Sequence, residues 1–243
     1  MNDNSSADRK RQATLRALAV AGCRHPDTPA QGLSGTGLVA DDLWLLGHDD
    51  RSGKPLLQPR ALGTGLAGGL LAELMLAGWI GLRPDSAVVI TGDAPEGAAG
   101  RHPLLKQVAG EPGPAPVWSW LRFLASSAAL DVALRLEQAG YLARVRGRVP
   151  ARRGQWVPVN PDWAFAPMLR VRSALDPARP LTAHAAALAG LAVACGLGFR
   201  LNHYQTQASR PVRDAVAQLG AGLQGLIAQT QTAVDSAVLS HRT

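Results

Sequence analysis

Residues 36–82 read TGLVADDLWLLGHDDRSGKPLL, followed directly by QPRALGTGLAGGLLAELMLAGWIGL. In the second part, apolar residues recur at helical spacing and give one continuous apolar face, which is typical of a buried helix. The leucines that recur at this spacing are Leu62, Leu66, Leu70 and Leu74. A proline suits the first turn of a helix and a glycine relieves its last carbonyls, so Pro59 and Gly78 indicate where this helix begins and ends.

Four glycines lie inside this helix, and each costs roughly 1 kcal/mol relative to alanine in an exposed helix interior. They are Gly63, Gly65, Gly68 and Gly69. We therefore expect another element to pack closely against them. Upstream, the apolar residues between Leu38 and Leu46 predict a shorter helix that runs into a turn at residues 47–53. The two helices should form a hairpin.

The rest of the chain predicts further helices and two small β-ribbons. The helices are expected at residues 102–109, 117–139, 161–174, 182–202 and 210–239. One ribbon is expected to join residues 80–82 and 88–90, and a second to join residues 142–149 and 155–159. The predicted fold class is mainly α, a single-domain helical bundle with a protruding basic β-hairpin.

Length and composition limit the class of protein. The chain has 243 residues, of which 47% are hydrophobic and 18% charged, and this suits one sizeable core. The net charge of +7 comes almost wholly from arginine and points to an acidic partner, either a membrane surface or nucleic acid. An equally good explanation is a codon bias that favours arginine wherever a solvated cation is needed.

The first 33 residues are polar and basic, so we expect a disordered basic leader at 1–33 and a folded domain at 34–239. Cys23 and Cys195 are too few for a disulfide framework or a metal site, which fits a reducing cytosol. The most apolar stretch, residues 185–199, is shorter than the roughly 20 residues that span a bilayer. We therefore expect a cytoplasmic protein that associates peripherally with the inner membrane surface.

The opening of the domain resembles a known family. The shared features are an apolar helix, the run HDDRSGK, the return Leu56-Leu57 and the helix GLAGGLLAELMLAGWI. They resemble the Golgi phosphoprotein family, the phosphoinositide-reading Golgi adaptors and their bacterial relatives. The pattern Glu73-Leu74-x-Leu76-x-Gly78-x-Ile80 is its most specific part, and the likeness extends more weakly to about residue 235. The resemblance implies a non-enzymatic adaptor that binds phosphoinositides, among them phosphatidylinositol 4-phosphate.

The chain departs from the headgroup pocket of the eukaryotic members. That pocket uses a tryptophan before the glycine-rich helix, an arginine within it and two arginines before the hairpin. The corresponding positions here are Gln58, Ala67, Ser126 and Ala129, which supply neither an aromatic wall nor cations. Three nearby arginines are candidates for a substitute anion site: Arg60, Arg122 and Arg135.

The second ribbon is the other candidate lipid contact. Strict alternation places arginines on one of its faces, and its turn adds more. These are Arg144, Arg146, Arg148, Arg152 and Arg153. Trp156 and Trp163 are expected to contact the membrane interface, unless they pack against the bundle instead. Each basic side chain near an anionic leaflet contributes about 1 kcal/mol. The resemblance implies that this hairpin also mediates self-association, so a homo-oligomer is expected as a possible state.

Catalytic and metal sites are not expected. The six histidines show no HxxxH or HExxH spacing, and the glycine-rich segments lack a following Gly-Lys-Ser/Thr. Asp41-Asp42 and Asp49-Asp50 fit a helix and a turn better than a pair of catalytic acids. We expect no enzyme activity and no cofactor.

Two other functions stay open. A helix followed by Gly140, a basic strand, a turn and a return strand also resembles the end of a winged-helix DNA-binding domain. Its recognition helix would present Ser126 to Asp131, which offer almost no base-reading side chains, so nucleic acid is an unlikely partner. A protein scaffold with no lipid role is the third possibility. The main prediction is an adaptor that binds anionic phospholipid headgroups.

Overall fold

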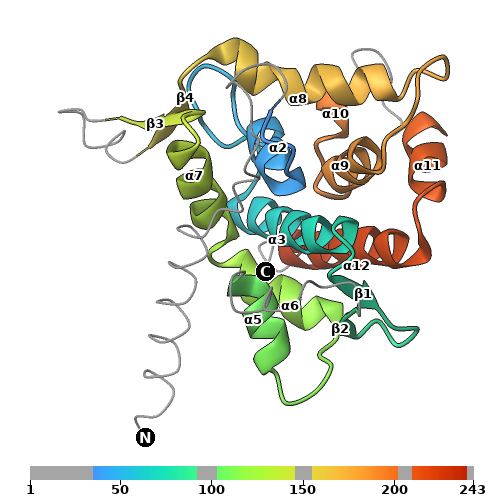
Figure 1. The fold of residues 1–243 in the computed structure, drawn as a ribbon. Helices are drawn as coiled ribbons and strands as arrows, with labels where there is room; N and C mark the ends of the chain where they lie inside the picture. Colours follow the sequence, from blue (N-terminus) through green and yellow to red (C-terminus); the bar gives the residue numbers. More distant parts are fainter. Residues whose placement is uncertain (1–34, 92–102, 146–154, 202–209, 240–243) are drawn as a thin grey trace, which may run out of the picture.

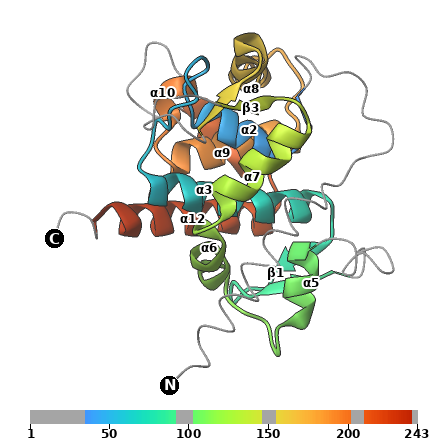
Figure 2. The ribbon, with the colours of Figure 1, turned by 90° about the vertical axis from the view of Figure 1, so that its left-hand side faces the viewer.

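The computed structural model describes residues 35–91, 103–145, 155–201 and 210–239. The expected leader at 1–33 therefore lies outside the described residues. Helix α3 (Pro59–Leu76) is the centre of the fold, and other helices surround it (Figures 1 and 2). It forms the expected hairpin with α2 (Val39–Leu46) across the turn at 47–53. Its expected limits are confirmed, since Pro59 opens it and Gly78 follows it with a φ of 74°.

The other elements complete a mainly helical fold with two short antiparallel ribbons, as predicted. In chain order they are β1 (Ile80–Leu82), β2 (Val88–Ile90), α5 (Pro103–Gly110), α6 (Val117–Ala125), α7 (Ala128–Gln138), β3 (Leu142–Arg144), β4 (Trp156–Pro158), α8 (Pro161–Ala174), α9 (Ala183–Ala194), α10 (Gly198–Leu201), α11 (Arg210–Ala217) and α12 (Ala221–Leu239).

The glycines of α3 let three neighbours approach its backbone. A Cβ atom added at Gly63 would collide with the carbonyl oxygen of Ala125 in α6, and one at Gly65 would collide with the sulfur of Cys195. At Gly69 the added atom would lie 3.0 Å from the Cα atom of Ala40 in α2. The close packing expected from the sequence is confirmed, and it accounts for the weak helix formers in a central helix.

Three of the predicted helices are each divided in two. Ser126 and Ser127 separate α6 from α7, and their side chains can hydrogen-bond locally in competition with the helix. Gly196, at a φ of 88°, separates α9 from α10. Residues 218–220 separate α11 from α12. The expectation of continuous helices at these three places was wrong, because the apolar pattern continues across each break.

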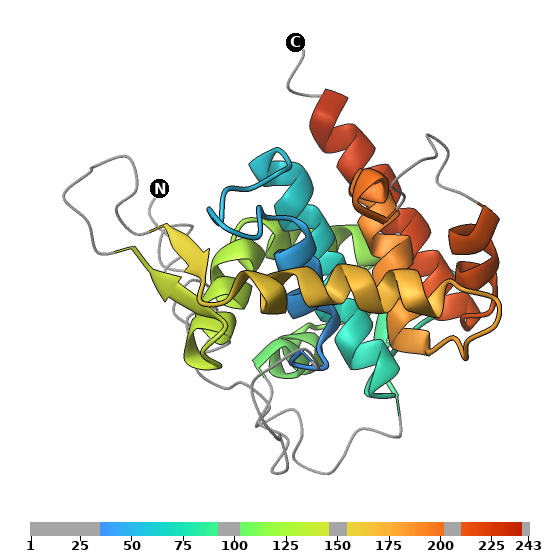
Figure 3. The ribbon, with the colours of Figure 1, turned by 90° about the horizontal axis from the view of Figure 1, so that it is seen from above.

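The second ribbon projects from the body beside α7, at the upper left of Figure 1. Its register pairs Leu142 with Pro158 and Arg144 with Trp156. Residues 146–154, which hold the expected tip, lie outside the described residues. Helix α8 leaves this ribbon and runs across one side of the molecule, as Figure 3 shows from above.

Candidate anion-binding site

Arg60 and Arg122, two of the three candidates for a substitute anion site, line one pocket. The pocket lies between the first turn of α3, helix α6 and the last turns of α12, and its volume is about 660 Å³. Its lining residues are Arg60, Thr64, Trp118, Arg122, Ala125, Ser126, Gln229, Thr232, Ala233, Ser236 and Ala237.

Each wall of the pocket follows from a helical pattern. Helix α6 buries Val117, Trp120, Leu121 and Leu124, so Trp118 and Arg122 lie one turn apart on its other side. The three polar residues that α12 contributes, Gln229, Thr232 and Ser236, are spaced by three and four positions, which places them on one side of the helix. Leu226 and Val234 of the same helix are buried in the core.

Trp118 supplies an aromatic wall that the sequence analysis missed. Its side chain is 48% exposed, and the guanidinium carbon of Arg122 lies 5.5 Å from the centroid of its ring. A cation held over an aromatic face at this distance is attracted by the ring quadrupole. The contact within this pair could be predicted, because Trp118 and Arg122 are four positions apart on one helix, but its place in the pocket could not.

The electrostatics of the pocket favour an anion. Two arginines line it, and no aspartate or glutamate is among the described residues of its lining. Arg60 lies in the first turn of an 18-residue helix, where backbone N–H groups and the helix dipole add partial positive charge. Within the described ranges, no side chain caps this end of α3. Hydroxyl and amide groups of α12 give the remaining wall hydrogen-bonding capacity.

The pocket overlaps in part with the positions that the resemblance assigns to the headgroup pocket of the family. Ser126 lines it, and Gln58 is the N-cap residue of α3, two positions before Arg60. Ala67, by contrast, is fully buried, so that position faces the core. The aromatic and cationic groups of this pocket thus come from Trp118, Arg60 and Arg122, which are neighbours of the expected positions.

Arg135 does not line this pocket and is paired internally, which argues against its expected role in anion binding. Its guanidinium Nε donates to Asp41 Oδ1 at 2.7 Å, and its two Nη atoms donate to Glu73 at 2.9 and 3.0 Å. Only 15% of its side chain is exposed. The sequence could not reveal these partners, since Asp41 lies 94 residues away and Glu73 lies 62 residues away.

This internal cluster carries shifted pKa values. Burial raises the pKa of Asp41 to about 6, even though the charge of Arg135 acts in the opposite direction. Burial by itself lowers the pKa of Arg135, but Glu73 and Asp41 together raise it. Arg135 therefore stays charged and holds α2, α3 and α7 together. A second ion pair on α2 joins Asp42 to Arg170 of α8 at 2.6 Å.

At the base of the hairpin, Arg144 is already engaged by the protein. Its Nε atom lies 3.3 Å from Glu137 Oε2, and its guanidinium carbon lies 4.6 Å from the centroid of the Trp156 ring. Trp156 Nε1 donates to the same carboxylate oxygen at 3.0 Å. Both groups therefore fix the hairpin to α7, which argues against direct lipid contact by either of them.

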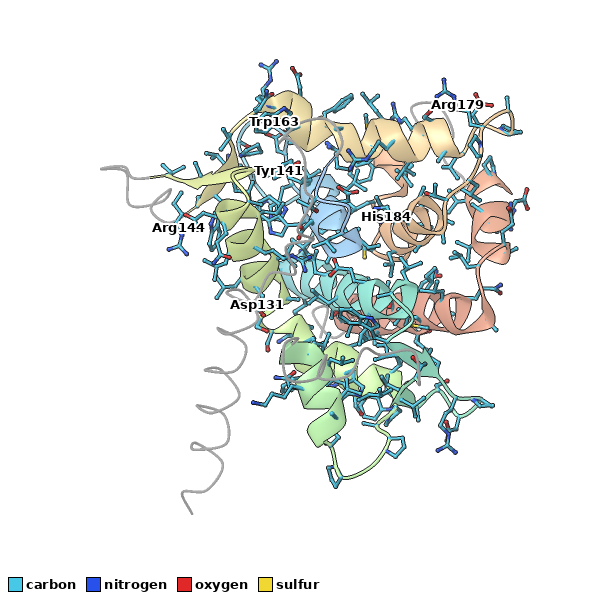
Figure 4. The ribbon with its side chains drawn as sticks, in the orientation of Figure 1. Asp131, Tyr141, Arg144, Trp163, Arg179 and His184 are labelled. Carbon is cyan, nitrogen blue, oxygen red and sulfur yellow. The ribbon has the colours of Figure 1, made fainter. Side chains whose placement is uncertain are left out.

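Trp163 also packs against the body. Its ring centroid lies 5.7 Å from that of Tyr141, and Figure 4 shows the two side chains near the base of the hairpin. Trp156 and Trp163 are both partly buried against the hydrophobic core, so the alternative in which they pack against the bundle holds. Four of the predicted arginines lie outside the described residues: Arg146, Arg148, Arg152 and Arg153.

The alternatives gain no support from the described residues. Helix α7 would be the recognition helix of a winged-helix domain, but it buries Asp131, Val132 and Leu136, and Arg135 is paired internally. Among the described residues, no group of three histidine, cysteine or carboxylate side chains could hold a metal ion. None of the described helices has the length and apolar character needed to cross a bilayer.

Comparison with known proteins adds one match. A family model described as Golgi phosphoprotein 3 (GPP34) matches residues 39–238. No curated protein matches the chain.

Proposed function

Because the chain belongs to the Golgi phosphoprotein 3 family, we propose that it is a non-enzymatic peripheral membrane adaptor. It binds an anionic phospholipid headgroup in the pocket lined by Arg60, Trp118 and Arg122. The resemblance to phosphoinositide-reading adaptors supports a lipid ligand, and the arginines of the pocket support a negatively charged headgroup.

One observation carries this proposal. Two arginines and an aromatic ring converge on a pocket whose described lining holds no carboxylate, although the protein neutralises other arginines internally. Arginine binds phosphate with a planar fork of donors, and the N-terminus of a helix favours the same charge. The pocket is therefore the place where a phosphate group would find uncompensated positive charge.

The hairpin has a supporting role in this proposal. Arg146, Arg148, Arg152 and Arg153 add general attraction to an anionic leaflet, which contributes about 1 kcal/mol per residue near the surface. Such attraction depends strongly on ionic strength, because exposed charges are screened within about 8 Å at physiological salt. Binding in the pocket should be less sensitive to salt. The two contributions can thus be separated by measurement.

Co-sedimentation with vesicles tests the proposal. Vesicles of phosphatidylcholine alone are compared with vesicles that also contain phosphatidylglycerol, phosphatidylserine or phosphatidylinositol 4-phosphate. Each comparison is made at about 50 mM and about 300 mM salt, which are roughly one-third and twice the physiological ionic strength. We expect binding only to the anionic vesicles. Equal binding to neutral and anionic vesicles, or no binding, would refute the lipid role.

Variants then locate the binding site. Replacing Arg60 and Arg122 together by alanine should weaken binding by at least about tenfold, because each charged contact contributes about 1 kcal/mol or more. The matched control is Arg83→Ala, which removes an exposed arginine from the β1–β2 turn. If the double variant and the control bind equally well, the pocket is not the headgroup site. Replacing Arg146 and Arg148 by glutamate measures how much the hairpin contributes to vesicle binding.

A further inference from the structure

Helix α8 exposes apolar side chains along its outer face. Phe165 is 37% exposed and Leu169 is 50% exposed, and Val159, just ahead of the helix, is 54% exposed. The inner face of the same helix buries Ala164, Met168 and Val171. A contiguous group of exposed apolar residues on a folded domain is a candidate contact surface.

The charges at the two ends of this face are opposite. Asp162 is exposed in the first turn of α8, and Arg172 lies in its last turn. Arg172 donates to the carbonyl oxygens of Leu201 and Arg200 at 3.1 and 2.8 Å, and these partners leave its positive charge uncompensated. The order along the face is therefore acidic, apolar, apolar and basic.

The spacing of these four residues is symmetric. Asp162, Phe165, Leu169 and Arg172 are separated by three, four and three positions, which keeps all four on one side of a helix. When a second α8 lies antiparallel to the first, Phe165 faces Leu169 of the other copy and Asp162 faces Arg172 of the other copy. Each contact then occurs twice, as a two-fold axis requires.

We propose that the outer face of α8 binds the same face of a second copy of this chain, with the two helices antiparallel. The apolar residues form the centre of the contact and the two Asp162–Arg172 pairs close its ends. The charge pattern specifies the direction, because a parallel arrangement would place like charges opposite each other. This contact differs from the expected self-association through the hairpin, and it does not depend on the proposed lipid site.

Sedimentation equilibrium of the full chain tests the contact. We expect a concentration-dependent dimer, and Leu169→Asp should weaken its association constant by at least about tenfold, because it removes two symmetric apolar contacts. The matched control is Leu130→Asp on α7, where the native side chain is 43% exposed. Circular dichroism confirms that both variants are folded. A monomer at all concentrations, or a dimer that Leu169→Asp does not weaken, would overturn the proposal.

Cross-linking tests the antiparallel register. Phe165→Cys and Leu169→Cys are made separately in a Cys23→Ser background, in which the remaining Cys195 is buried. Mild oxidation of the two variants mixed together should give a disulfide-linked dimer, since residue 165 faces residue 169 of the other copy. Either variant alone should give at least about fivefold less disulfide-linked dimer. In that case the two thiols are at the same position of the two copies, and they lie about four residues apart along the helices, roughly 6 Å. Equal yields from the single variants would contradict the register.

A final comparison separates this surface from the hairpin. Replacing Arg146 and Arg148 by glutamate should leave the dimer intact if α8 forms the contact. Loss of the dimer in that variant, with the dimer retained in Leu169→Asp, would assign self-association to the hairpin and refute the proposal.

Discussion

At the scale of single residues, arginines that look alike in the sequence have different roles in the structure. Arg60 and Arg122 line a pocket, Arg135 is an internal ion-pair partner and Arg144 anchors the hairpin. The differences depend on carboxylates that are distant in sequence or lie on another element. A count of basic residues therefore overestimates the charge that this protein can offer to an anionic surface.

The role of Arg144 gives a first prediction at this scale. If Arg144 contacted lipid, Arg144→Gln would lose about 1 kcal/mol, which is about a fivefold loss of affinity for anionic vesicles. Because Glu137 and the Trp156 ring hold its guanidinium, we expect less than about a twofold loss. Vesicle co-sedimentation measures the difference, with Arg122→Ala as the positive control. A fivefold loss in Arg144→Gln would return this residue to the lipid site.

Asp131 gives a prediction for pH. Its side chain is buried near the start of α7 (Figure 4), and one of its carboxylate oxygens has no hydrogen-bond partner among the described residues. Burial raises the pKa of Asp131 from 3.8 to about 6. Between these two values the folded state binds more protons than the unfolded state, so this residue makes the protein less stable as pH rises.

Asp131→Asn removes the titrating group and keeps the shape of the side chain. We expect the variant to be more stable than the native protein by about 1–3 kcal/mol at pH 7.5, because a shift of about two pKa units at about 1.4 kcal/mol per unit sets the upper end and solvent screening reduces it. The gain should shrink as pH falls from 6 toward 4. Urea denaturation at several pH values measures it, and taking the difference between the two proteins cancels the contribution of His48, whose pKa burial lowers to about 4. A gain in stability that does not change with pH would contradict the raised pKa of Asp131.

At the scale of elements, the contact between α3 and α6 shapes the pocket. The two helices meet where Gly63 lies against the backbone of Ala125, and residues of both helices line the pocket beside this contact. Gly63→Ala would force the helices apart, because the obstacle is backbone and cannot rotate away. We expect destabilisation by about 1–3 kcal/mol together with weaker vesicle binding.

Gly110→Ala is the matched control for this variant. Gly110 is the last residue of α5, and an added Cβ there would meet no atom of the described part of the chain within 4 Å. We therefore expect a change in stability within about 0.5 kcal/mol and no change in vesicle binding. If Gly63→Ala were as stable as the control, the close approach of α3 and α6 would not be needed for the fold.

The limits of α3 were predictable because they depend on local chemistry, a proline at one end and a glycine at the other. The breaks at Ser127 and Gly196 were not, because the apolar period continues past both and tertiary packing decides where the chain turns. For the site, Arg60 and Arg122 were predicted from their nearness to the resembled positions. Trp118 was missed, since nothing in the sequence shows that this side of α6 faces α12.

At the scale of the whole molecule, the two proposed surfaces lie on different sides. Helix α8 runs across the top of Figure 1, whereas the start of α3 and the end of α12, which carry the pocket, meet at the upper edge of Figure 3. The residues of α3, α6 and α12 that line the pocket are thus distinct from the residues of α8 that form its outer face. Lipid binding and pairing through α8 can occur at the same time.

An antiparallel α8 pair has a two-fold axis that crosses the helices and lies in the plane of their contact. The axis relates two copies of the pocket, one in each chain. When both pockets of a dimer reach one membrane, the second headgroup binds as an intramolecular event.

The last prediction follows from this geometry. At protein concentrations where the native chain is dimeric, it should bind anionic vesicles at least about tenfold more tightly than Leu169→Asp, although the pocket is intact in both. Leu130→Asp should bind like the native chain. Isothermal titration with soluble inositol phosphate or glycerol phosphate gives the affinity of one pocket, which should be equal in all three proteins. Equal vesicle affinities in the native chain and Leu169→Asp would mean that the two pockets of a dimer do not reach one membrane.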